Sequence, residues 1–177
     1  NSWTPAVGNN YTNFVTTSAA KNTAATLPTL ATGKSTGKEI LEARINALLA
    51  SADPFGDAKI TYSAVTSSLS NYYVVNYWAA NHYDLGHIQG AVQYTPKADL
   101  KLAANLKTLP TNKTVVVYCY TGQTSAQVAA VLRVMGYDAK SLMFGVNTMN
   151  YDWMTGKGMT QFTSSEVKQF PYVTGTN

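Results

Sequence analysis

The chain of 177 residues is 45% hydrophobic, which is enough to build one domain with a core of its own. It has no apolar run approaching the ~18 residues of a membrane-spanning helix, so we expect no membrane contact. The net charge of +4 reflects few acids rather than many bases, and it mildly favours small anions as ligands. The two arginines and the scattered lysines form no cluster, which argues against a nucleic-acid partner.

The start of the chain predicts an arm followed by a helix. Residues 1–34 are rich in Thr, Asn, Ala and Ser without a clear period, which is typical of an irregular arm that lies on the domain or is partly mobile. Residues 35–58 are expected to form an N-terminal helical extension, because Thr36 and Glu39 have the spacing of a capping box and an apolar helix face follows them.

Strand and helix patterns alternate over residues 59–157, the expected main domain. Short apolar and β-branched runs predict strands at 72–78, 113–119 and 139–144, a short strand or turn at the start of residues 60–69, and a brief extended piece that Pro96 closes. Longer periodic patterns predict helices at 63–69, 79–85, 97–109, 124–136 and 147–154. Residues 158–177 are expected to form a C-terminal tail with a short helix at 163–170. The alternation predicts an α/β fold, with a central parallel sheet and helices on both faces.

The only cysteine, Cys119, ends the most apolar of these strands and precedes a helix. Ligands of parallel sheets bind beyond the carboxyl ends of the strands. The loop CYTGQT must turn tightly there, and Gly122 can adopt a backbone conformation that other residues resist. Its amides and the free N–H groups at the helix start are expected to converge on the sulfur and to keep it largely as a thiolate at neutral pH. The residues alone leave a buried structural thiol as the alternative.

The counts of metal-binding side chains exclude other classes of site. One cysteine allows no internal disulfide and no Cys-rich zinc site, and a total of two histidines argues against a metal centre, so we expect neither metal nor cofactor. His82 is interpreted as a solvated surface residue. Thr, Ser, Asn and Tyr supply a weakly charged polar surface, which favours a periplasmic or secreted protein, with a cytoplasmic one as the alternative. The sequence predicts no oligomeric state.

Two motifs resemble the rhodanese-like sulfurtransferases. In residues 119–137 a Cys, a loop with a Gly, a Ser-Ala pair and a helix that ends in Gly are similar to the active-site loop and following helix of that family. Residues 83–96 are similar to a second signature of the family. The residues that match this signature and the conserved ending of the domain are Gly86, His87, Ile88, Gly90, Ala91 and Trp153. The resemblance covers roughly residues 60–157 and implies a rhodanese-like fold.

The resemblance also implies a reaction. Cys119 would be the nucleophile that takes a sulfane sulfur from a donor such as thiosulfate, forms a persulfide, and passes the sulfur to cyanide or to a thiol. The implied partner is therefore a small sulfur-containing anion, a thiol or a persulfide. The residues implied to bind it through their amides are Tyr120, Thr121, Gly122, Gln123, Thr124 and Ser125. The position of His87 in the family signature implies a structural role.

The sequence also departs from the family pattern. Asn76-Tyr77-Trp78 replaces the usual Asp-Val-Arg, Thr124 stands where many members have Arg, and Gly145 is the remainder of a Gly-Gly pair. The alternative function is therefore a catalytically weak or inactive rhodanese-like binding module. Phosphatase chemistry requires Cys-x5-Arg, and the sixth residue after Cys119 is Ser125, which excludes it. Lys157 is a candidate for the missing positive charge, although a plain turn explains its Gly-flanked segment.

Overall fold

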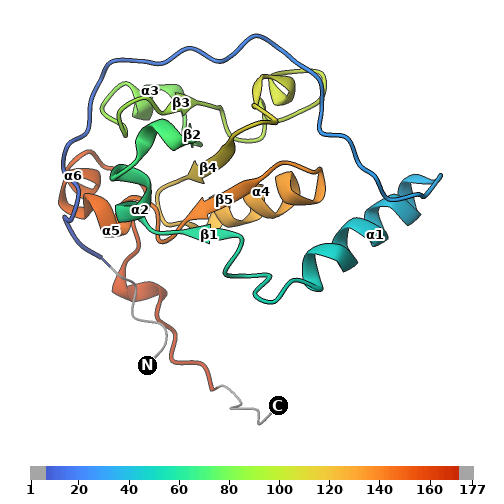
Figure 1. Ribbon diagram of the computed structural model, residues 1–177. Helices are drawn as coiled ribbons and strands as arrows, with labels where there is room; N and C mark the ends of the chain where they lie inside the picture. The colour runs from blue at the N-terminus through green and yellow to red at the C-terminus, as the bar shows by residue number, and fades with distance from the viewer. Residues whose placement is uncertain (1–6, 172–177) are drawn as a thin grey trace.

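A five-stranded parallel sheet forms the centre of the computed structural model, which describes residues 7–171 (Figure 1). The strand order is β1-β5-β4-β2-β3, and all four neighbouring pairs are parallel. The strands are Lys59–Ile60 (β1), Tyr72–Asn76 (β2), Val92–Gln93 (β3), Thr114–Tyr118 (β4) and Ala139–Leu142 (β5). The α/β fold expected from the alternating patterns is confirmed.

Strand β4 lies at the centre of the sheet because its side chains are apolar on both faces. Val116 and Tyr118 join one buried cluster, and Val115 and Val117 join the other. The first cluster is covered by α2 (Tyr62–Thr66), α5 (Val146–Met149) and α6 (Tyr151–Gly156). The second is covered by α4 (Gln123–Val134), through residues such as Leu132. The sheet thus has helices on both faces, as predicted.

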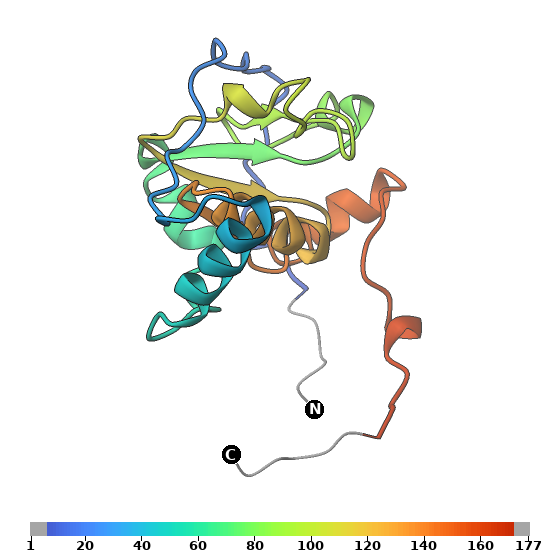
Figure 2. The ribbon, with the colours of Figure 1, turned by 90° about the vertical axis from the view of Figure 1, so that its right-hand side faces the viewer.

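Helix α1 (Gly37–Leu49) lies beside α4, outside the two clusters (Figure 2). The predicted capping box is present: the Glu39 amide donates to Thr36 Oγ1 at 3.3 Å, and the Thr36 amide donates to Glu39 Oε2 at 3.3 Å. None of the residues of α1 is fully buried. Arg44 fixes the helix to the domain by donating to the carbonyls of Arg133 and Val134 at the end of α4.

The helix predicted at 97–109 is wrong. This segment forms successive turns and a single 3-10 turn, η2 (Leu106–Thr108). Lys97 has a left-handed backbone with φ of 63°, which a right-handed helix cannot include. Asp99 then bends the chain, since its side chain accepts hydrogen bonds from the Thr95 amide and from Asn105 Nδ2. The apolar spacing was genuine, but local bonds to Asp99 outcompete the helix.

The described part of the N-terminal arm, residues 7–34, is irregular and lies along the domain (Figure 1). Its backbone bonds successively to the backbone of Asn147 and Met149, to His87, and to Lys107. The Val15 bond to His87 is double, with both N–H···O distances at 2.9 Å. The arm therefore links segments that are far apart in the domain. Residues 1–6 of the predicted arm and 172–177 of the predicted tail lie outside the described residues.

Short helical turns complete the described chain. They are α3 (Ala80–Tyr83), η1 (Leu69–Asn71) and η3 (Ser164–Glu166). The last is the only helical part of the segment 163–170, where the sequence predicted a short helix. Between residues 7 and 171, no helix combines the length and the apolar character needed to cross a membrane.

Candidate active site at the carboxyl end of the central strand

Cys119 follows β4 at the carboxyl edge of the sheet, and only 2% of its surface is exposed. Its Sγ accepts hydrogen bonds from the amide of Gly122 at 3.2 Å and from the amide of Ser125 at 3.4 Å. Ser125 lies in the first turn of α4, which begins at Gln123, slightly earlier than predicted. Two backbone N–H groups and the start of a helix thus surround the sulfur, an arrangement that stabilises negative charge there.

The loop residues named from the sequence contribute differently. Within the described residues, only Gly122 and Ser125 donate their amides to Sγ. Thr121 donates its hydroxyl to the side chain of Gln123, at 3.4 Å. Gln123 and Thr124 are exposed at the start of α4. The six residues therefore form the loop before α4 and the first turn of that helix, and two of them, Gly122 and Ser125, contact the sulfur.

A serine pair extends the environment of the sulfur. Ser125 Oγ lies 3.6 Å from Cys119 Sγ, 3.0 Å from the Gly122 carbonyl oxygen and 2.9 Å from Ser141 Oγ on β5. Both serines are buried. Ser125 has one hydroxyl proton and can donate it to the Gly122 carbonyl or to the sulfur, while Ser141 donates to the Ser125 oxygen. When Cys119 becomes negatively charged, the Ser125 hydroxyl can thus rotate from the Gly122 carbonyl towards the sulfur and stabilise that charge.

The loop after β5 holds the cysteine loop in place through backbone contacts. The Val146 amide donates to the Cys119 carbonyl at 3.2 Å, and the Asn147 amide donates to the Tyr120 carbonyl at 3.1 Å. This approach requires Gly145, which has φ of 54°, because a Cβ there would overlap the Cys119 carbonyl oxygen and lie 2.8 Å from that of Tyr120. The glycine that the sequence retains from the family's Gly-Gly pair thus lies against the site.

The segment Asn76-Tyr77-Trp78 lines the site without any charge. Trp78 is fully buried and stacks on Tyr120, with ring centroids 5.1 Å apart and planes within 4°. Asn76 Nδ2 donates to the Tyr118 hydroxyl at 2.8 Å, and the Tyr77 hydroxyl accepts from the Lys97 amide at 2.8 Å. Where the family pattern has an acid and a base, this chain has an amide and an indole held by stacking and neutral hydrogen bonds.

The interpretation of His82 as a solvated surface residue is wrong. Its side chain is partly buried, and Nδ1 lies 2.6 Å from the Tyr120 hydroxyl. Burial, reinforced by the nearby negative charge of Cys119, raises the pKa of Tyr120 to about 12. The phenol therefore stays protonated at neutral pH and can donate to Nδ1. Positions 82 and 120 are 38 residues apart, and no sequence pattern connects them.

His87 is fully buried between the main domain and the N-terminal arm. Its Nδ1 lies 2.8 Å from the Tyr83 carbonyl oxygen, and its Nε2 lies 3.0 Å from the Thr17 carbonyl oxygen. The ring also stacks on Tyr83, with centroids 3.6 Å apart. Both nitrogens are thus engaged by the backbone, which agrees with the structural role implied by the family signature.

Three cationic side chains that could carry a positive charge are Arg44, Arg133 and Lys157, and none of them is bonded to the cysteine loop. Arg44 bonds to the end of α4, and Arg133 donates to the carbonyls of Asp57 and Ala139. Lys157 is exposed just after α6. Among the described residues, no three His, Cys, Asp or Glu side chains group together as metal ligands would.

Comparison with known proteins finds one matching family model, which covers part of the chain. Residues 74–149 match the sequence model of the rhodanese-like domain. No curated protein matches the chain. Solved structures similar to it include a rhodanese-related protein from Thermoplasma volcanium, at 20% identity and a TM-score of 0.46 over 58% of this chain and 94% of that one. Another is the rhodanese-like domain of a protein from Anabaena sp, at 19% identity and 0.43 over 68% and 89%.

A third similar structure comes from Rhodopseudomonas palustris and is described as a protein of unknown function and possible tyrosine phosphatase. It is 17% identical, with a TM-score of 0.44 over 69% of this chain and 93% of that one. The family match includes the second half of β2, β4, the cysteine loop, α4 and β5, which together form the candidate site. The chain thus contains a rhodanese-like domain, which the match places at residues 74–149.

Proposed function

We propose that this protein is a sulfurtransferase that carries sulfur as a persulfide on Cys119. The observation that carries the proposal is the pair of hydrogen bonds that the backbone amides of Gly122 and Ser125 donate to the Cys119 sulfur, at 3.2 and 3.4 Å. A thiolate so held is a ready nucleophile without a general base, and the same amides can hold the charge of a terminal persulfide sulfur.

The proposed reaction has two steps. The Cys119 thiolate attacks the outer sulfur of thiosulfate, a sulfur–sulfur bond forms to give the Cys119 persulfide, and sulfite leaves with the electron pair of the broken bond. Cyanide or a thiolate then attacks the outer sulfur of the persulfide, and the Cys119 thiolate is regenerated as the leaving group. The sulfur atom is transferred without an external oxidant or reductant, and the protein needs no cofactor for either step.

A rhodanese-like binding module without activity is the second candidate. Two observations favour it: the thiol exposes only 2% of its surface, and the wall at Asn76-Tyr77-Trp78 has no charge. Phosphatase chemistry has no support in the site, because no arginine lies in the loop and both arginines of the chain bond to backbone carbonyls elsewhere.

Mass spectrometry of the intact protein distinguishes the two candidates. After incubation with thiosulfate, the wild type should gain the mass of one sulfur atom, and cyanide should remove it as thiocyanate. Cys119 is the only thiol, so Cys119→Ser is a complete control and should gain nothing. A wild type that gains no sulfur, or a Cys119→Ser variant that gains it equally, would contradict the proposal.

A further inference from the structure

Helix α1 lies at the margin of the domain (Figure 1) and carries an apolar stripe that remains exposed. Leu41, Ile45 and Leu49 follow one another at intervals of four residues and therefore lie on one side of the helix, where they are 48%, 38% and 56% exposed. Phe55, in the turn after the helix, is 75% exposed. Single exposed apolar side chains are ordinary, but a row of them marks a surface that binds another protein.

An apolar groove of about 200 Å³ adjoins the stripe. It lies between α1, the turn at residues 54–58 and α4, and Ile45 and Leu49 belong both to its lining and to the stripe. Arg133 is the only charged residue of this lining, and its side chain donates to backbone carbonyls. The groove can therefore receive an apolar side chain of a partner that covers the stripe.

The stripe is complementary to itself. Ile45 is its midpoint, so a two-fold axis through Ile45 places a second copy of α1 antiparallel to the first. Leu41 of each copy then lies against Leu49 of the other. Because Leu49 also lines the groove, the second copy's Leu41 lies at the edge of that groove, beside Phe55. A second copy of this chain thus matches the stripe with apolar side chains along its whole length.

The charges at the two ends of α1 favour the same arrangement. Lys38 lies in the first turn, two helical turns before Ile45 and on the same side, and its pair with Glu42 is exposed and 3.8 Å long, so it contributes little. The last turn has no basic residue, although the helix dipole is negative there. Asp53 follows that turn, exposed and without a salt bridge to any described residue. The antiparallel arrangement brings Lys38 of each copy to this negative end of the other.

We propose that α1 forms the contact between two copies of this chain, related by a two-fold axis at Ile45. The inference goes beyond the proposed sulfur transfer and does not depend on it, because neither the stripe nor the groove includes a residue of the cysteine loop. Each copy contributes one side of a helix and one turn, which is a small interface. The dissociation constant of the dimer is therefore of order tens of micromolar.

Analytical ultracentrifugation over protein concentrations of about 1–500 µM tests the association. The wild type should shift from monomer to dimer. Leu41→Lys should weaken the dimer about tenfold or more, because it buries an ammonium group in the apolar contact. Lys is a good helix former and Leu41 is half exposed, so the variant should fold.

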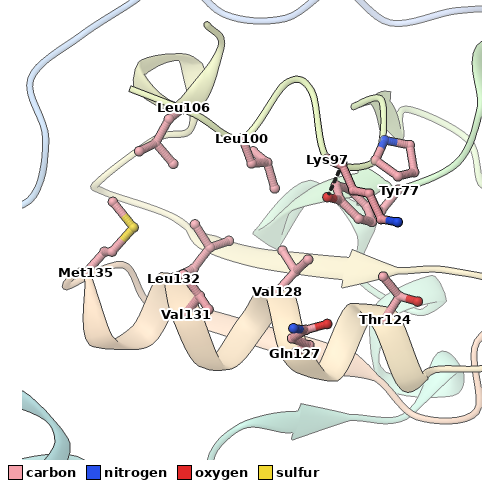
Figure 3. A pocket seen from close by; sticks show the side chains of 11 residues that line it. Tyr77, Lys97, Leu100, Leu106, Thr124, Gln127, Val128, Val131, Leu132 and Met135 are labelled. Atoms are coloured by element: carbon pink, nitrogen blue, oxygen red, sulfur yellow. Dashed lines mark hydrogen bonds between the residues drawn. The ribbon is translucent and has the colours of Figure 1, made fainter. Parts of the chain in front are cut away.

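The matched control is Val131→Lys. Val131 is 53% exposed on α4, but it lines a different groove, between α4 and residues 96–106 (Figure 3). This variant should dimerise like the wild type. Equal weakening by Leu41→Lys and Val131→Lys overturns the inference. A wild type that stays monomeric at every concentration also overturns it, and the stripe then belongs to the contact with a different protein.

Cross-linking tests the two-fold axis. In a Cys119→Ser background, which has no other thiol, Ile45→Cys should form a disulfide-linked dimer under mild oxidation, because a residue on the axis meets its own copy. Leu41→Cys should not, because antiparallel helices hold the two copies of residue 41 about 12 Å apart along the helix axis, beyond the reach of a disulfide. Cross-linking of Leu41→Cys as fast as that of Ile45→Cys overturns the proposed arrangement.

Discussion

Gly145 shows how a single missing side chain shapes the candidate site. The carbonyls of Cys119 and Tyr120 lie so close to its Cα that a Cβ could not be placed there. The start of α5 can therefore approach the cysteine loop, and its Val146 and Asn147 donate their amides to those carbonyls. Each of these hydrogen bonds holds one carbonyl, and a carbonyl shares its peptide plane with the N–H of the next residue. The bonds therefore also fix the direction of the N–H groups that follow Cys119 and Tyr120.

Gly145→Ala should lower the rate of persulfide formation about a hundredfold, because the added methyl group displaces the loop by a fraction of an ångström or more. The rate is measured by mass spectrometry after mixing with thiosulfate. Gly158→Ala is the matched control: Gly158 has a similar φ of 66°, but no atom lies within 4 Å of its Cβ position. The two variants share the cost of the left-handed backbone. Equal rates in both would mean that contact with the cysteine loop is unimportant.

Among the secondary-structure elements, the attachment of α1 to α4 depends on one arginine, Arg44. Helix α1 has no fully buried residue, so apolar packing alone holds it weakly. Arg44 compensates by donating to the Arg133 carbonyl at 2.9 Å and to the Val134 carbonyl at 3.1 Å. These are carbonyls of the last turn of α4, where the helix dipole is negative and a cation is favourable. The same α4 begins at the cysteine loop, so its stability concerns the site.

Arg44→Met should lower the free energy of unfolding by about 1–2 kcal/mol, because two charge-assisted bonds to the end of α4 are lost. Urea unfolding followed by circular dichroism measures the change. The control Lys38→Met removes a cation of the same helix whose pair with Glu42 is exposed and 3.8 Å long, and it should have little effect. If Lys38→Met lowers the free energy of unfolding as much as Arg44→Met does, the loss of a positive charge on α1, and not the loss of the two hydrogen bonds to α4, is responsible.

At the scale of the whole molecule, buried tyrosines connect the sheet to its surroundings. The Tyr118 hydroxyl accepts from Asn76 Nδ2 and from the Ile88 amide, and the Tyr94 hydroxyl bonds to Tyr73 and Thr108. Burial raises the pKa of Tyr118 and of Tyr94 well above the ordinary value, and that of Tyr120 to about 12. In the folded protein these phenols stay neutral at pH values where the unfolded chain has begun to ionise.

The free energy of unfolding should therefore be unaffected by these groups below pH 10 and should fall steeply above it. Each raised pKa favours the protonated phenol in the folded state, so its contribution is fully present below the unfolded value of 10.0 and is lost as pH rises through the folded one. Urea unfolding between pH 8 and 12 measures the slope. Tyr94→Phe should show a shallower fall. An identical slope in Tyr94→Phe would show that other groups cause the loss.

Local periodicity in the amino-acid sequence is enough to predict the sheet, the start of α1 and the position of the cysteine loop. The parallel sheet follows from short apolar runs such as residues 115–118 between helical patterns, and α1 begins where Thr36 and Glu39 predict it. Cys119 and the loop to Ser125 were identified from their place after the central strand and from the resemblance to the family. Each of these signals lies within a few neighbouring residues, so the chain carries it before it folds.

Which distant groups meet at the site depends on how the chain packs in three dimensions. Two such contacts join segments with no shared periodicity: His82 pairs with Tyr120, and Gly145 approaches the Cys119 carbonyl. Residues 97–109 kept their helical spacing and still formed turns, because bonds to Asp99 compete with the helix locally. Such contacts depend on how the strands and loops pack in space, and spacing along the chain cannot specify that.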